Sequence, residues 1–138
     1  MKRLRTDQRG AIALQAAAMA PLLALVVLLV LFTGRVVDAN SSVQAAAHEA
    51  SRAASLAGTP SDAGAAAQAT AEANLNAGGL TCRTLTVTPD LSQFQAGGWV
   101  TVTVTCDADF SDMTLLGVPG SRSFTETAIE VVDTYRGG

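Results

Sequence analysis

The sequence is poor in the residues from which enzyme sites are usually built. Charged residues make up 15% of its 138 residues and aromatic residues 4%, and His48 is the single histidine. Both percentages are low for a soluble enzyme. The sequence has no nucleophile–base pair, metal-ligand cluster, phosphate-binding loop or cofactor motif, and His48 has no second ligand near it, so we interpret it as a solvated helix residue. We therefore predict a protein that is not an enzyme and takes no metal, cofactor or small-molecule substrate.

Positive charge is scarce too, and much of it gathers at one end. Residues 1–10 carry Lys2, Arg3, Arg5 and Arg9 against Asp7, a net +3, which leaves −6 for the rest of a chain whose total is −3. An acidic body argues against nucleic-acid binding, which normally needs a basic face. The basic head directly precedes an apolar run, so it indicates that the N-terminus stays in the cytoplasm.

The apolar run extends from Ala11 to Thr33 without a formal charge. As a helix it would span roughly 35 Å, enough for a ~30 Å hydrocarbon core with some tilt. We expect a single transmembrane helix over residues 11–34, with the C-terminal part of the chain outside the cytoplasm. A cleaved secretory signal ending at Val37-Asp38-Ala39 is the rival interpretation, but the apolar region of such signals is usually only ~7–15 residues long.

Three residues in or beside this run carry a resemblance. Gly10 precedes it, Gln15 lies near its start, and Pro21 lies inside it, where proline removes a backbone hydrogen bond and tends to kink the helix. This order resembles type IV prepilins, in particular the TadE-like minor pilins of the tight-adherence (Tad) system. Those commonly read arginine-glycine, a short apolar stretch, glutamate, more apolar residues, then proline and a leucine/valine run. Here the matching residues are Arg9-Gly10, "AIAL", Gln15, "AAAMA", Pro21 and "LLALVVLLVLF".

The resemblance implies a minor pilin or pseudopilin that a prepilin peptidase cuts between Gly10 and Ala11. It implies three kinds of partner: that peptidase, other Tad pilins and minor pilins, and the lipid bilayer. The chain would cross the bacterial cell membrane once, with its C-terminal domain extracytoplasmic, enter an extracellular pilus after assembly, and contribute to adhesion. The family's usual glutamate, thought to neutralise the freed N-terminal amine of a neighbouring subunit, is Gln15 here, which can only form hydrogen bonds. An uncleaved, membrane-anchored binding or structural module is the alternative.

Two Ala-rich segments fill residues 35–80. The first continues the membrane helix to Gly58-Thr59-Pro60 and spaces small residues by four and three, as in a heptad seam. The second, Pro60–Leu80, predicts another helix with Ser61 or Asp62 as N-cap and a stop at Gly78-Gly79. The predicted seam comprises Val36, Asn40, Val43, Ala47, Ala50, Ala54 and Ala57.

The composition changes at Thr81 to three Thr- and Val-rich segments, "TCRTLTVT", "WVTVTVTC" and "SFTETAIEVV". These are strand signals, and in the second segment Val100, Val102 and Val104 share one face, which we expect to be buried under the helices. The sequence thus predicts an α+β, pilin-like fold with a three-stranded antiparallel sheet. Its predicted parts are a basic leader at 1–10, a transmembrane helix at 11–34, a helical region at 35–80 and a β module at 81–138.

Cys82 and Cys106 are the two cysteines. If the first hairpin is centred near residues 93–94, Cys82 and Cys106 lie opposite each other on the paired strands to within one residue. An extracytoplasmic location then permits a disulfide between them. Cys106 shares the face of Val104, whereas Cys82 is off the face of Leu85, so a bulge near Arg83 or a late strand start must reconcile them. Two reduced, buried cysteines are the alternative.

Three aspartates, Asp107, Asp109 and Asp112, follow the second cysteine closely. Alternating aspartates can begin a calcium loop, but the glycine and the distal glutamate of an EF-hand loop are missing. We interpret the segment as a solvated turn and predict no metal there.

Overall fold

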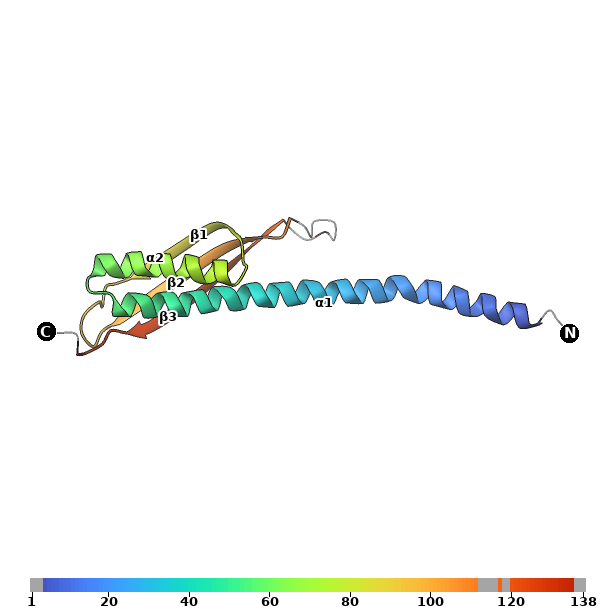
Figure 1. Cartoon of the computed structure of the whole chain (residues 1–138), viewed down its shortest axis with the longest axis horizontal. Helices are drawn as coiled ribbons and strands as arrows, with labels where there is room; N and C mark the ends of the chain where they lie inside the picture. The colour runs from blue at the N-terminus through green and yellow to red at the C-terminus, as the bar shows by residue number, and fades with distance from the viewer. Residues whose placement is uncertain (1–3, 112–116, 118–119, 136–138) are drawn as a thin grey trace. The chain divides into compact units, whose positions relative to one another are not determined.

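A computed structural model describes residues 4–111, 117 and 120–135 of the chain (Figure 1). Lys2 and Arg3 of the predicted leader, and Asp112 of the aspartate segment, lie outside the described residues. The elements in chain order are α1 (Leu4–Leu56), α2 (Pro60–Ala77), β1 (Cys82–Asp90), β2 (Trp99–Asp109) and β3 (Ser121–Val131). Two helices followed by one antiparallel sheet confirm the predicted α+β class.

The contacts within the chain divide it into two units, Met1–Val37 and Asp38–Gly138. Helix α1 contributes to both: it supplies the helix of the first unit, and its residues from Asp38 onward belong to the second. The second unit also contains α2 and the whole sheet. The four-part division expected from the sequence stays a prediction.

The buried face of α1 in the second unit is broader than the predicted heptad seam. Asn40 is exposed, and Ala39 beside it is buried in its place. An α-helix has 3.6 residues per turn, so its core-facing stripe drifts away from a strict seven-residue repeat and widens. The buried α1 residues are Ala39, Val43, Ala46, Ala47, Ala50, Ser51, Ala54 and Ser55. Four predicted seam positions are thus confirmed, and Ala57 lies beyond the end of the helix.

Two of these buried residues are serines whose hydroxyls have partners within the helix. Ser51 Oγ donates to the carbonyl oxygen of His48, and Ser55 Oγ donates to that of Arg52, each at 2.8 Å. Because each hydroxyl donates to a carbonyl within the helix, serine packs here as a small residue without leaving a buried donor unpaired.

Helix α2 begins one or two residues before its predicted cap. Its N-cap is Thr59, and Pro60 occupies the first helical turn, where its missing N–H would have had no intrahelical partner. The backbone N–H of Asp62 donates to Thr59 Oγ1, and Thr59 Oγ1 donates in turn to the Asp62 carboxylate at 2.8 Å. The expectation of Ser61 or Asp62 as N-cap was wrong, because the cap residue precedes the helix and here also precedes the proline.

The C-terminus of α2 confirms the predicted glycine stop. Gly79 has φ +72°, a conformation that suits glycine. It lets the N–H of Leu80 donate to the carbonyl of Leu75, and its own N–H donate to that of Asn76. This is the hydrogen-bond pattern of a Schellman motif.

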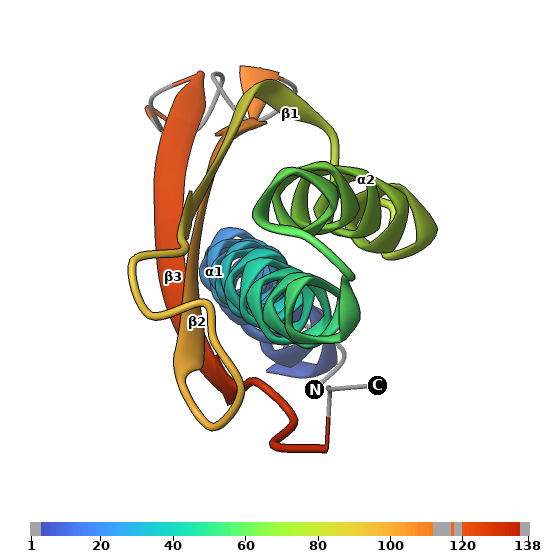
Figure 2. The ribbon, with the colours of Figure 1, turned by 90° about the vertical axis from the view of Figure 1, so that its left-hand side faces the viewer.

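The three strands form one antiparallel sheet in the order β1-β2-β3. Both views place α2 and the α1 residues of the second unit on the same face of the sheet, with the other face uncovered (Figure 2). Val100, Val102 and Val104 of β2 are fully buried on the covered face, as the alternation predicted. Small helix residues let the backbones approach closely, so the valines of the central strand supply much of the core volume.

The β1–β2 connection is tied to the end of β3. The N–H of Gly97 donates to the carbonyl of Val132, and the N–H of Val132 donates to that of Gly98, at 3.0 and 2.9 Å. Inside the loop, Gly98 lies so close to the carbonyl of Gln93 that a Cβ atom would overlap it. Only glycine fits this approach of two backbones.

Candidate membrane and assembly helix

The described part of the first unit is helical, and most of the large apolar side chains described there are exposed. Leu14 is 76% exposed, and the other exposed large apolar residues of this unit are between 43% and 67% exposed. Among the described residues, α1 is the helix whose length and composition would allow it to cross a membrane. The exposed apolar residues are Ile12, Leu14, Met19, Leu22, Leu23, Leu25, Val26, Val27, Leu28, Leu29, Val30, Leu31 and Val37. Such a continuous apolar surface is characteristic of a segment covered by lipid or by partner helices.

The four N-terminal residues singled out by the sequence all lie on this helix. Gly10, Ala11 and Gln15 are exposed and helical, and α1 continues through Pro21 without a break. A Cβ atom at Gly10 would meet no atom within 4 Å. The helix therefore does not require glycine at position 10 for packing.

The predicted disulfide is present between Cys82 and Cys106, with 5.4 Å between their Cα atoms. The predicted bulge is also present, because the β1–β2 register shifts between Cys82 and Thr84, at Arg83. The extra residue turns Cys82 to the face of Leu85, which is the covered face. The cysteines are not directly opposite, however: Cys82 pairs with Ala108, and Cys106 pairs with Leu85. The loop centre lies about two residues later than predicted, so the bond runs diagonally between the strands.

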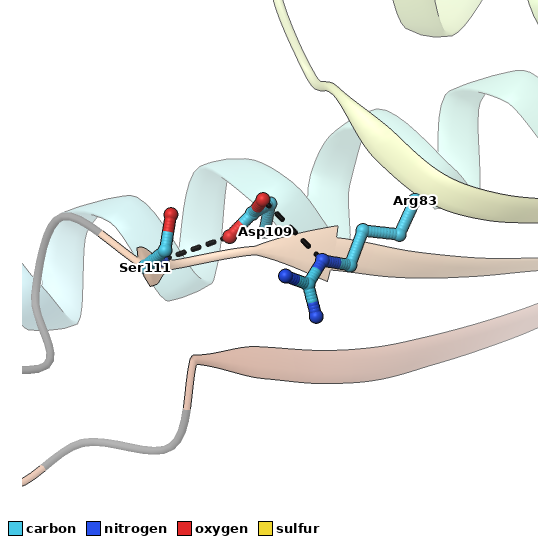
Figure 3. A network of polar contacts seen from close by, with 3 residues as sticks. All are labelled: Arg83, Asp109 and Ser111. Carbon is cyan, nitrogen blue, oxygen red and sulfur yellow. Dashed lines mark hydrogen bonds and ion pairs between the residues drawn. The ribbon is translucent and has the colours of Figure 1, made fainter.

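The bulge also brings Arg83 to Asp109 (Figure 3). Arg83 Nε lies 3.4 Å from Asp109 Oδ2, and the backbone N–H of Ser111 donates to Asp109 Oδ1 at 2.9 Å. The hydrogen bonds from Ser111 lower the pKa of Asp109 below its ordinary value, and the charge of Arg83 acts in the same direction. The pair is solvent-exposed, so it contributes little to stability at neutral pH.

Asp109 is thus engaged in a local turn and an ion pair. In the part of the chain that the structure describes, no three His, Cys, Asp or Glu side chains gather as metal ligands would. The question of a calcium loop includes Asp112 and so extends beyond the described residues. His48 is exposed on α1, in agreement with its interpretation as a solvated helix residue.

Sequence reasoning missed one feature of the second unit, an apolar cluster on the uncovered face of the sheet. Trp99 is 51% exposed, and Val131, its direct partner in register, is 67% exposed. Ile129, in the next row, is 63% exposed. The alternation of side chains along β2 could have revealed this cluster. Trp99 directly precedes Val100, so its side chain lies on the face opposite the buried valines.

Comparison with known proteins addresses the N-terminal helix. A family model described as TadE-like protein matches residues 10–52. No curated protein and no solved structure matches the chain. The matched segment begins at Gly10, contains Gln15 and Pro21, and ends within the buried stretch of α1. Over residues 10–52, which include this N-terminal helix, the chain is similar to the TadE-like protein family.

Proposed function

We propose that this protein is a minor pilin or pseudopilin of a Tad pilus system, with a structural and adhesive role rather than an enzymatic one. It would insert with residues 1–10 in the cytoplasm, cross the membrane once through residues 11–34, and hold its second unit outside. A prepilin peptidase would cut between Gly10 and Ala11. The helix beginning at Ala11 would then pack against the helices of other pilins.

The observation that carries this proposal is the family match over residues 10–52 on a helix whose apolar side chains are exposed. Covering those side chains with lipid or partner helices removes a large apolar area from water, worth on the order of 25 cal/mol per Å². The same surface can serve first as an anchor and later as an assembly interface, because both environments are apolar. The disulfide supports an extracytoplasmic second unit, since disulfides persist in oxidising compartments.

Gln15 favours a second candidate, an uncleaved single-pass protein that holds its second unit outside the membrane. A carboxylate at this position could neutralise the N-terminal amine of a neighbouring subunit, whereas an amide offers only hydrogen bonds. Loss of this charge pairing would weaken entry into a filament and leave anchoring unaffected. N-terminal processing distinguishes the two candidates.

The test is the intact mass of the protein from membranes of its native host, for the unchanged chain and for Gly10→Leu. Because a Cβ atom at Gly10 would meet no atom within 4 Å, the substitution should block cutting without disturbing packing. Gly34→Leu is the matched control, since position 34 is equally open. We expect the unchanged chain and Gly34→Leu to lack Met1–Gly10, and Gly10→Leu to be full length.

The other outcomes are equally informative. An unchanged chain that keeps Met1 to Gly10 refutes processing and leaves the anchored module. A cut near Ala39 would identify a secretory signal instead. That result is not expected, because Ala39 is buried in the second unit and lies inside the family match.

A further inference from the structure

The uncovered face of the sheet carries an ordered apolar cluster at the end where β2 begins and β3 ends. Trp99 and Val131 are direct cross-strand partners, and Ile129 lies in the adjacent row opposite Thr101. All three side chains are more than half exposed. We call these three residues the sheet-face patch. They together expose on the order of 300 Å², in the range where apolar patches are often functional.

The rest of this face carries paired threonines. The hydroxyls of Thr103 and Thr127 are 2.9 Å apart, and those of Thr105 and Thr125 are 3.0 Å apart. Each pair forms a hydrogen bond across β2 and β3. In each pair one hydroxyl donates to the other, so one O–H per pair is left to bind water, and a partner surface that covers this face displaces fewer hydrogen bonds to water.

The charge next to the patch is acidic. Asp90 lies in the same cross-strand row as Thr101 and Ile129, whereas Asp107 lies on the same face near the other end of β2, eight residues from Trp99. Arg83, a basic residue near the other end of this face, is paired with Asp109. Hydrogen bonds from Ser92 hold the pKa of Asp90 below its ordinary value, so this carboxylate is ionised at neutral pH.

We propose that the sheet-face patch is a docking surface for a different protein, one that presents an apolar centre flanked by lysine or arginine. A second copy of this chain would present the same acidic residue, Asp90, beside its own patch, and like charges oppose such a contact. A sugar would set its hydroxyls against Ile129 and Val131, which offer no hydrogen bonds. Trp99 supplies the aromatic anchor typical of the centre of a protein interface.

The size of the patch indicates the kind of encounter. A standard interface buries roughly 800 Å² per partner, so about 300 Å² of anchor area suits a weak contact. Two chains anchored in one membrane meet at high effective concentration, which makes such a contact effective. In this respect the proposal rests on the proposed function, because it places the partner in the same membrane.

The experiment is photo-crosslinking in the native host with the full chain. One version carries a photo-crosslinking amino acid at Ile129, and a matched version carries it at Glu72, exposed on α2. We expect an adduct at position 129 that is absent at position 72. Mass spectrometry should place the crosslink in a different protein, on a peptide with apolar residues beside lysine or arginine.

Two variants of Thr127 test the charge argument. Thr127→Lys and Thr127→Glu both remove the hydrogen bond to Thr103, and they differ in the sign of the charge added beside Ile129. Thr127→Lys should lower the adduct yield several-fold, whereas Thr127→Glu should keep it. Trp99→Ser should lower the yield at least about tenfold, as expected for an interface anchor. A retained Cys82–Cys106 disulfide shows that each variant still folds.

Three results would overturn the proposal. The first is an adduct of twice the mass of the chain, which would identify a second copy as the partner. The second is equal yield at positions 129 and 72. The third is equal loss with Thr127→Lys and Thr127→Glu. The N-terminal mass of the same sample reports separately on processing, so failure of the docking surface is distinguishable from failure of the proposed function.

Discussion

Removal of the Cys82–Cys106 disulfide should destabilise the second unit strongly, because its core is built largely from alanine and valine. The bond joins residues 24 apart in sequence, and constraining a loop of this length in the unfolded chain is worth about 3.5 kcal/mol. For a unit of roughly 100 residues, this corresponds to a fall in Tm of roughly 15–25 °C. The perturbation is Cys82→Ala together with Cys106→Ala, since alanine avoids an unpaired hydroxyl at the buried Cys106 position.

Thermal unfolding of the full chain in detergent, followed by the emission of Trp99, measures this effect. Trp99 is the single tryptophan and lies in the sheet, so its signal reports on the second unit and not on the apolar helix. The unchanged chain should lose a similar amount of stability in reductant, and the double alanine variant should be insensitive to reductant. A double variant that unfolds within about 3 °C of the oxidised chain would refute the reasoning.

Two further predictions use single substitutions. Gly98→Ala should cost about 2 kcal/mol or more in the free energy of unfolding, because its Cβ would overlap the carbonyl of Gln93. Gly64→Ala lies inside α2, where its Cβ would make only an ordinary contact to Pro89, so it should instead stabilise the fold by about 0.5–1 kcal/mol. Denaturant titration of the two variants measures both free energies of unfolding, and equal effects would contradict the prediction. The pKa of Asp109 is lowered from 3.8 in the folded state. Ionised Asp109 therefore contributes to the free energy of unfolding above pH 3.8, and this contribution is lost as pH falls through the folded pKa. The Tm difference between the unchanged chain and Asp109→Asn, measured from pH 2 to 6, should therefore shrink at the acidic end, and a difference that does not vary with pH would count against this account.

The elements of the fold were predictable from local sequence patterns. The alternation of Val100, Val102 and Val104 with threonine fixed which face of β2 is buried, because side chains in a strand point to opposite faces in turn. Gly78-Gly79 marked the end of α2 by the same local logic. The conflict between the faces of the two cysteines predicted either a bulge near Arg83 or a late strand start, and the structure has the bulge.

Some predicted details were wrong: the centre of the first hairpin, the width of the buried face of α1 and the N-cap of α2. They depend on contacts between distant segments or on which of several neighbouring residues caps a helix. The hairpin centre was displaced because the connection between β1 and β2 bonds to the end of β3, through Gly97 and Val132. The buried face of α1 was broader than the predicted seam because an α-helix has 3.6 residues per turn, so its core-facing stripe departs from a strict seven-residue repeat. The N-cap was predicted at Ser61 or Asp62, whereas the cap is Thr59, which directly precedes Pro60.

The sequence by itself determined the N-terminal helix, because a long uncharged run has few physical alternatives and the order Gly10, Gln15, Pro21 is local information. It also determined the class of the fold, since the periods of the helices and strands are properties of short segments. Only the tertiary structure decided the diagonal disulfide, the Arg83–Asp109 pair and the sheet-face patch. Each depends on strand register, and register is set by the way the loops and the helices pack around the whole sheet.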